Sequence, residues 1–218
     1  MKRKFQHIAY LLMVAAVLTS CGEKKQTSEF PDWAWADFQR PEGINPIVSP
    51  DTTTVFYCPM RQDSVAWESS DTFNPAATIY DGKVVVLYRA EDNSAVGIGS
   101  RTSRLGYAYS DDGLHFNRMT VPVFYPADDN QKELEWPGGC EDPRVAVTDD
   151  GLYVMLYTQW NRKQARLAVA TSRDLQIWEK YGPAFAKAYG GRFFDEFSKS
   201  ASIVTKLVDG KQVIAKID

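Results

Sequence analysis

The hydrophobic positions of this chain come in short runs rich in β-branched and aromatic residues, each bounded by turn residues. The clearest runs are Lys83 to Tyr88 and Leu152 to Thr158, which have the length and composition of strands. Asp81-Gly82 and Asp150-Gly151 precede them, and Asp-Gly is a strong β-hairpin signal. Helix periodicity is absent except for a short turn near Asp32 to Phe38. The pattern predicts an all-β fold.

These segments repeat along the chain. Arg104 to Phe116 aligns with Arg166 to Trp178 at a constant offset of 62 positions. The stretch beginning at Asn74 aligns with the stretch beginning at Asp142, and a third copy begins near Ser200. Such a period, with β-rich segments and Asp-Gly turns, is typical of β-propeller blades. Because a propeller must close to remove its open edges, we expect roughly the first two to three blades here.

One motif combines flexible and rigid backbone around two carboxylates. It runs from Gly138 to Arg144 with the sequence Gly-Gly-Cys-Glu-Asp-Pro-Arg. The Gly pair permits a tight turn or a close approach to a ligand, and Pro143 favours extended geometry at Asp142. If Asp142 begins a strand, Arg144 lies on the same face, and a carboxylate beside a cation suits acid–base chemistry. The alternative is a turn closed by an Asp–Arg ion pair.

Together with four other segments, this motif resembles glycoside hydrolase family 130, the β-mannoside phosphorylases and hydrolases. The other segments are Asn74 to Ala77, Tyr88 to Asp92, Ser103 to Gly106 and Arg166 to Ser172. The resemblance covers the chain from Pro41 onward. It implies a five-bladed β-propeller, and it makes Asp142 the general acid, because the Asp of this motif has that role in the family.

The repeats also indicate where a sugar site would lie. Asn74, Asp142 and the Lys199-Ser200 pair stand before or at the start of equivalent inner strands, so we expect them to converge. Strand-end capping is the alternative for Asn74 and Ser200. The full set of expected substrate-binding residues is Asn74, Arg89, Glu91, Asp92, Arg104, Trp136, Glu141, Arg144 and Trp160.

These candidates rest on different grounds. The resemblance places Arg89, Glu91 and Asp92 at the sugar-binding end, whereas without it they would read as surface ion pairs. Arg104 and Arg166 occupy the same position of successive repeats, so one is expected to be structural and one functional. Trp136 and Trp160 flank the motif, and aromatic rings pack on the apolar face of a pyranose. Trp178, which aligns with Phe116, is expected in the core.

Two chemistries are open to the family, and both invert the anomeric centre. A phosphorylase uses inorganic phosphate as co-substrate and needs cations, for which Arg162, Arg166 and Lys199 are candidates. A hydrolase needs a carboxylate base, for which Glu196 is a local candidate. No other cofactor and no metal site are expected, because His115 is the only His after the leader.

The first residues have the features of a secretion signal. A basic start, Lys2 to Lys4, precedes an apolar stretch, Ile8 to Leu18, that is too short to span a bilayer. Leu18 to Gly22 resembles a bacterial lipobox, in which Cys21 is lipidated; an ordinary signal peptide is the alternative. We expect a signal at 1–20, a tether and lead-in at 21–40, and a partial propeller at 41–218. The protein is then a lipid-anchored, periplasm-facing envelope lipoprotein.

Charge and location narrow the function. Cleavage after residue 20 leaves 22 basic and 28 acidic residues, a net charge of −6, which argues against nucleic acid as a partner. Cys58 and Cys140 remain, the latter expected to be small and buried beside the site. Because an exported phosphorylase would strand a charged product, we expect a β-mannoside hydrolase. A phosphorylase releasing mannose 1-phosphate is the alternative, and a non-catalytic glycan-binding propeller, disfavoured by Asp142, is the third reading.

Overall fold

The computed structural model describes residues 38–209 and 211–215. The chain divides into two units, Met1–Pro41 and Glu42–Asp218, and the strands described below all lie in the second. The expected signal, the expected lipidation site Cys21 and the turn expected near Asp32 lie outside the described residues. Within the described ranges, no helix is long and apolar enough to cross a membrane.

The first half of the second unit is a four-stranded antiparallel group. It consists of β3 (Asp71–Tyr80), β4 (Lys83–Glu91), β5 (Ser103–Ser110) and β6 (Asn117–Arg118). A short hairpin of β1 (Phe56–Cys58) and β2 (Asp63–Val65) precedes it. Asp81 and Gly82 join β3 to β4 with φ of 48° and 73°, as a two-residue hairpin turn with two left-handed residues requires. The predicted Asp81-Gly82 turn is confirmed.

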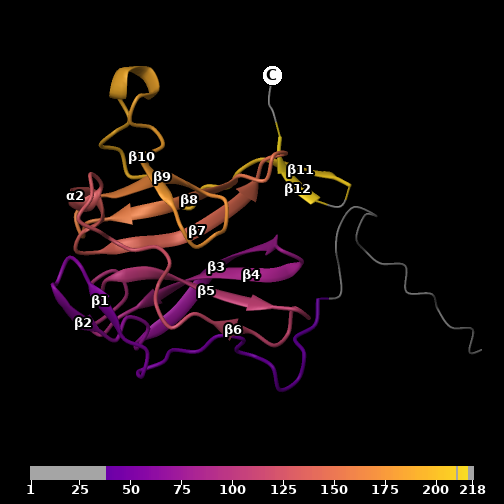
Figure 1. Ribbon diagram of the computed structural model, residues 1–218. Coiled ribbons are helices and arrows are strands. Elements are labelled where there is room, and N and C mark those ends of the chain that lie inside the picture. Colours follow the sequence, from indigo (N-terminus) through magenta and orange to yellow (C-terminus); the bar gives the residue numbers. More distant parts are fainter. Residues whose placement is uncertain (1–37, 210, 216–218) are drawn as a thin grey trace, which may run out of the picture. The chain divides into compact units, whose positions relative to one another are not determined.

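The second half repeats this arrangement. Its strands are β7 (Gly139–Val147), β8 (Tyr153–Trp160), β9 (Ala165–Ser172) and β10 (Glu179–Pro183), again antiparallel. The short helix α2 (Lys132–Glu135) lies on the connection between the two strand groups. In Figure 1 the first group is drawn in purple to pink and the second in orange. The predicted Asp150-Gly151 hairpin is also confirmed, with a longer loop from 148 to 152 between β7 and β8.

The predicted repeat is therefore real in three dimensions. β5 and β9 begin 62 positions apart, at Ser103 and Ala165, and have the same length. A single parallel bridge between Ser103 and Gly139 links the two groups. The third copy supplies β11 (Thr205–Val208) and β12 (Lys211–Ile214), an antiparallel pair, and a short 3-10 helix (Ala188–Gly191) precedes it. The fold class is all-β, as predicted; the number of blades stays a prediction.

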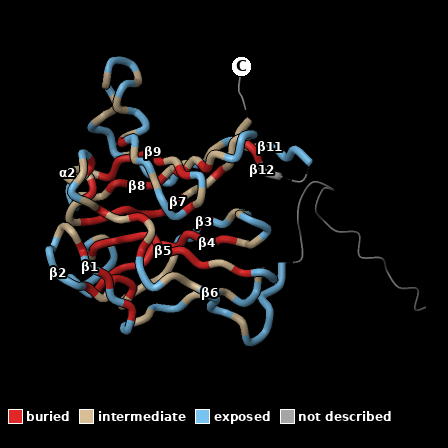
Figure 2. Tube along the Cα trace, in the orientation of Figure 1, coloured by how far each residue is buried: buried red, intermediate tan, exposed pale blue. Residues whose placement is uncertain are grey.

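The core explains the unbroken apolar run from Val84 to Tyr88 in β4. Val85 and Leu87 belong to a buried cluster shared with Met155 and Tyr157 of β8. Val86, Tyr88 and Ala90, on the opposite face, pack with the β1–β2 hairpin and Trp67. A strand covered on both faces reads as a continuous hydrophobic run rather than an alternating one. Figure 2 shows the buried stretches along β4, β5, β7 and β8, and Trp178 packs against the first cluster, as predicted.

Candidate functional site

Asn74 and Asp142 each sit at an interruption of an inner strand. The pairing of β3 with β4 shifts register between Phe73 and Ala76, and that of β7 with β8 shifts between Glu141 and Arg144. Asn74 and Asp142 have φ of 44° and 52°, the left-handed region that Asn and Asp tolerate best. A β-bulge of this kind re-aims a side chain.

This geometry corrects one prediction. We expected Pro143 to hold Asp142 extended at the start of a strand, but β7 begins at Gly139 and Asp142 is left-handed within it. The Pro lies in the bulge, where the ladder pairs neither Asp142 nor Pro143, so its missing N–H costs no sheet hydrogen bond. Ser200, at the equivalent position of the third copy, also has a positive φ, 58°.

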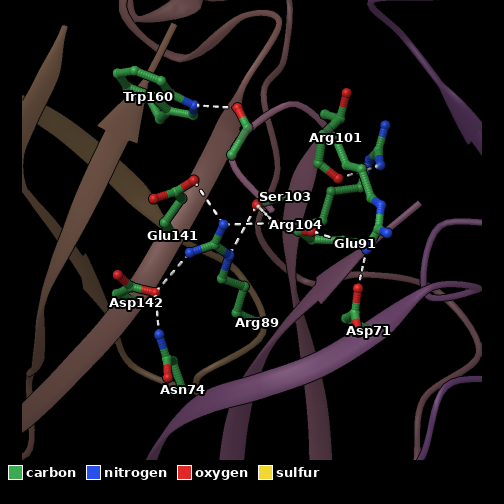
Figure 3. A network of polar contacts seen from close by, with 12 residues as sticks. Asp71, Asn74, Arg89, Glu91, Arg101, Ser103, Arg104, Glu141, Asp142 and Trp160 are labelled. Carbon is green, nitrogen blue, oxygen red and sulfur yellow. Dashed lines mark hydrogen bonds and ion pairs between the residues drawn. The ribbon is translucent and has the colours of Figure 1, made fainter. Parts of the chain in front are cut away.

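Arg89 of β4 is the centre of the polar cluster shown in Figure 3. Its Nη1 donates to Asp142 Oδ1 (3.0 Å), and its Nη2 donates to Glu141 Oε1 (2.8 Å) and Glu91 Oε1 (2.6 Å). Its Nε donates to Ser103 Oγ (3.0 Å). All five residues are buried. A planar guanidinium with five donors can hold several carboxylates in fixed directions, and Arg89 does so here with three.

Two further residues complete the surroundings of Asp142. Asn74 Nδ2 donates to Asp142 Oδ1 (2.9 Å), so this oxygen accepts from both Asn74 and Arg89. Lys199 Nζ lies 3.0 Å from Glu141 Oε2 and 3.4 Å from Asp142 Oδ2. The remaining carboxylate oxygens of the pair thus face a partly exposed ammonium group, which marks the accessible side of the cluster.

The two adjacent carboxyls differ in acidity. Burial alone would raise the pKa of Asp142, but the hydrogen bond from Asn74 and the Arg89 guanidinium outweigh it and hold that pKa below its ordinary value. For Glu141 burial prevails over Arg89 and Lys199, and its pKa is raised. The site therefore holds two neighbouring carboxyls whose environments push their pKa values apart, which is a common arrangement for acid–base chemistry.

The Gly pair that precedes them permits a close contact between the two strand groups. A Cβ on Gly139, where φ is 115°, would lie 2.2 Å from the Ser103 carbonyl oxygen. A Cβ on Gly138 would lie 2.3 Å from Trp160. The Ser103 N–H donates to the Gly138 carbonyl at 2.8 Å. Gly139 thus permits the close approach of the first group to the second, and Gly138 leaves room for Trp160 of β8.

Comparison with known proteins identifies the family. The model of glycoside hydrolase family 130, described as beta-1,4-mannooligosaccharide phosphorylase, matches residues 39–217. This chain belongs to glycoside hydrolase family 130. A 1,2-beta-oligomannan phosphorylase of Thermoanaerobacter sp. (strain X514) is 36% identical over 152 residues, which are 68% of this chain and 46% of that protein.

Solved structures give the same family. A protein of Bacteroides thetaiotaomicron VPI-5482 solved as a candidate glycosidase is 99% identical, with a TM-score of 0.86 over 88% of this chain and 55% of that one. A second structure is 69% identical, with a TM-score of 0.85 over 87% of this chain and 53% of that one. It is described with the statement that the family of mannoside phosphorylases contains glycoside hydrolases that target beta-1,2 mannosidic linkages in Candida mannan. This chain spans about half the length of these relatives.

Within this family 130 chain, the structure gathers part of the predicted set. Arg89, Glu91, Asn74, Glu141 and Asp142 form one contiguous cluster with Lys199. Sequence reasoning did not single out three members of the surrounding network, Ser103, Arg101 and Asp71. Ser103 bonds to Arg89 and Glu91, and Arg101 pairs with Asp71 and lies 3.5 Å from Glu91 Oε2. Ser103 lay within a family segment, whereas Arg101 gave no signal beyond its charge near a strand end.

Arg104 and Asp92 form a separate buried pair. Arg104 Nη1 donates to Asp92 Oδ2 (2.8 Å), and its Nη2 lies 3.5 Å from the sulfur of Cys58. Arg104 is fully buried, so in this structure it supports the first strand group rather than facing a ligand. Arg166, its counterpart, pairs with Asp195 at 2.8 Å. Cys58 is free and buried, as is Cys140, for which burial was predicted.

Arg144 does not make the contact expected of it. Its Nη1 donates to the Pro143 carbonyl (2.9 Å), and the cations beside Asp142 are Arg89 and Lys199. The alternative of a turn closed by an Asp142–Arg144 ion pair is therefore wrong, because the bulge between them turns the two side chains to different partners.

The remaining candidates lie around the cluster. Trp160 Nε1 donates to the Gly99 carbonyl (2.7 Å), and Trp136 packs with the Trp67 cluster. Arg162 and Glu196 are exposed. The three cations expected to bind phosphate have different surroundings, since Arg166 is engaged by Asp195 and Lys199 by the carboxyl pair. Among the described residues, no group of His, Cys, Asp and Glu side chains could hold a metal ion.

Proposed function

We propose that the protein containing this chain is an inverting glycoside hydrolase of β-mannosides, with Asp142 as general acid. The observation that carries the proposal is the Asp142 carboxyl itself, which is buried and fixed through Oδ1 by Asn74 and Arg89. Among the described residues, its Oδ2 is approached only by a partly exposed Lys199. A fixed carboxyl with one accessible oxygen is suited to protonating a single, defined atom of a bound sugar.

The low pKa of free Asp142 is compatible with this role. Burial is already the largest influence on this pKa, and it acts upward. A sugar that covers the cluster excludes more water and separates Lys199 from Oδ2, and both changes favour the protonated carboxyl. Asp142 then takes up its proton in the substrate complex, where the leaving oxygen, or a sugar hydroxyl that relays to it, receives it.

Two observations favour hydrolysis over phosphorolysis. Of the cations expected to bind phosphate, Arg166 is engaged by Asp195 and the Phe194 carbonyl, and Lys199 by Glu141 and Asp142. The relative at 69% identity is described with hydrolases of beta-1,2 mannosidic linkages. We therefore propose β-1,2-linked mannosides as the substrate. Phosphorylase remains the second candidate because of the 36% identity to a 1,2-beta-oligomannan phosphorylase.

An inverting hydrolase also needs a carboxylate base across the sugar from the acid, with room for a water molecule. Glu141 and Asp142 share the Arg89 guanidinium, so both carboxyls lie on one side of a bound sugar. Glu196 is exposed and has no contact with the cluster among the described residues. We propose that the base comes from outside the Glu141–Asp142 pair.

The test uses the full-length protein and β-1,2-mannobiose, with and without inorganic phosphate. We expect free mannose at a rate that phosphate does not change, and proton NMR should show the α-anomer first, as inversion requires. Phosphate-dependent formation of mannose 1-phosphate would contradict the hydrolase proposal and support the phosphorylase. Absence of any mannoside turnover, with a folded protein that binds the sugar, would favour the glycan-binding alternative.

A further inference from the structure

Loop 93–101, which connects β4 to β5, begins and ends in the carboxylate cluster. Glu91 and Ser103 are paired at its base, and Ser103 Oγ donates to Glu91 Oε1 at 3.1 Å. Close to its end, Arg101 pairs with Asp71 and lies 3.5 Å from Glu91 Oε2. The loop therefore cannot move at its base without disturbing residues that contact Arg89.

The middle of the loop is held from the other strand group. Trp160, the last residue of β8, donates its indole N–H to the Gly99 carbonyl at 2.7 Å. The indole is itself fixed, because it packs where a side chain on Gly138 would be. Within the loop, Arg101 Nε donates to the Ala95 carbonyl at 3.2 Å. Figure 3 shows Trp160 and Arg101 flanking the Arg89–Glu141 pair.

The loop presents two stiff apolar side chains to solvent. Val96 is 94% exposed and Ile98 is 68% exposed, and both are β-branched, so little rotamer entropy is lost when they are covered. They alternate with Gly97 and Gly99, which have φ of 89° and 82° and would place a Cβ in open space. The glycines therefore set the backbone shape of the loop rather than relieve crowding.

We propose that Val96 and Ile98 contact a mannose unit beyond the two that flank the cleaved bond, and that Trp160 is the positioning residue that holds the loop for this contact. The proposal rests on the proposed function and adds chain length as a property that the enzyme selects. It also changes the part played by Trp160. The indole N–H is engaged by the loop backbone, so the residue acts through loop 93–101 and not through a sugar hydroxyl.

The experiment compares full-length wild type with two variants on β-1,2-mannobiose and β-1,2-mannotriose. Val96→Ser with Ile98→Ser removes the apolar contact, and Trp160→Phe keeps a ring over Gly138 but removes the N–H. Ile177→Ser is the control. Ile177 is 78% exposed and follows the C-terminal end of β9, whereas Trp160 pairs with Ala165 at the other end of that strand. For the wild type we expect kcat/KM to be at least about fivefold higher on the triose than on the biose, a modest share of what burying two aliphatic side chains can supply.

In the double variant this ratio should fall to about one through a higher KM for the triose, with kcat on the biose unchanged within about twofold. Trp160→Phe should lower the ratio in the same direction. It should also speed cleavage between residues 93 and 101 by elastase at least about threefold, as located by mass spectrometry, because the loop opens more readily without its anchor. Ile177→Ser should match the wild type in both measurements.

An unchanged triose-to-biose ratio in the double variant would overturn the sugar contact, as would a wild-type ratio near one. Unchanged elastase cleavage in Trp160→Phe would overturn the proposal that the Trp160–Gly99 hydrogen bond holds the loop. If the wild type cleaves no β-mannoside of any length, the proposed function fails and the sugar contact fails with it. The elastase measurement then still tests whether Trp160 holds loop 93–101, since it needs no turnover.

Discussion

Asn74 and Asp142 occupy the same position of two successive structural repeats, and the side chain of the first donates a hydrogen bond to that of the second at 2.9 Å. Both are left-handed residues in a β-bulge. One repeat thus supplies a carboxyl and the other an amide at the equivalent place. The repeated backbone irregularity brings the two side chains together.

Replacing Asp142 by Asn tests the acid role. The amide keeps the shape and can still accept from Asn74, but it cannot give up a proton as an acid. We expect kcat/KM of the full-length enzyme on β-1,2-mannobiose to fall about 10²–10⁴-fold, with an unchanged circular dichroism spectrum. Asp149→Asn, at an exposed turn, is the matched control. Activity above about a tenth of wild type would remove Asp142 from this role.

Asn74→Ala should move the pH dependence. The hydrogen bond from Asn74 lowers the pKa of Asp142, so its removal raises that pKa. Because the protonated form is the active acid, activity is lost as pH rises through this pKa, and a higher pKa shifts the alkaline limb of kcat/KM upward. The expected change is therefore a displacement of the alkaline limb to higher pH, measured from pH profiles of kcat/KM for both proteins. A limb that stays in place, or moves down, would separate Asn74 from the titration of Asp142.

Much of the local structure could be predicted from the sequence, because it depends on local signals. The Asp81-Gly82 turn, the β4 and β8 runs and the 62-residue repeat all follow from turn chemistry and patterning. The backbone of Asp142 could not be predicted, since the local preference of a residue before Pro favours extended geometry. Contacts with Arg89 and Asn74, which are 53 and 68 positions away, outweigh that preference.

Side-chain partners were predicted less well, because they too depend on contacts between positions far apart in the sequence. Arg144 is two positions from Asp142 and was the natural partner, yet the bulge turns the two side chains apart and Arg89 takes the place. The network through Arg101 and Asp71 depends on where loop 93–101 returns to the strands, which no local pattern encodes. The family resemblance named Arg89 and Asp142, but their mutual contact is a property of the assembled sheets.

Arg89→Met should destabilise the full-length protein by about 3–5 kcal/mol, because it leaves three buried carboxylates without their shared cation. Arg166→Met is the control, since its partner Asp195 is largely exposed and can be solvated. Arg166→Met should therefore lower the free energy of unfolding much less than Arg89→Met does. Urea unfolding at pH 7 measures both. Equal losses in the two variants would show that the buried cluster is not held together by Arg89.

Cys21→Ala tests the proposed location. If a lipid on Cys21 anchors the protein, the variant should leave the membrane fraction and appear in the soluble periplasmic or secreted fraction. Immunoblots of fractionated cells that express the full-length protein give the answer, and Cys58→Ala is the control with an intact lipobox. A variant that stays with the membrane would contradict the lipoprotein proposal.

Gly139→Ala tests the contact between the two strand groups. An added Cβ would meet the Ser103 carbonyl at 2.2 Å, and φ of 115° is strained for any L side chain. The obstacle is backbone of the adjoining strand β5, which cannot rotate away.

Gly151→Ala is the matched control, because it has the strained φ alone, 80°, with nothing within 4 Å of the added Cβ. That variant should lose about 1 kcal/mol of unfolding free energy, and Gly139→Ala at least about twice as much, because the clash adds to the backbone strain. Since Ser103 also bonds to Arg89, Gly139→Ala should lower kcat as well, whereas Gly151→Ala should leave it unchanged. Similar losses of stability and activity in both variants would show that Gly139 is needed only for its backbone conformation and not for the close approach of β5 and β7.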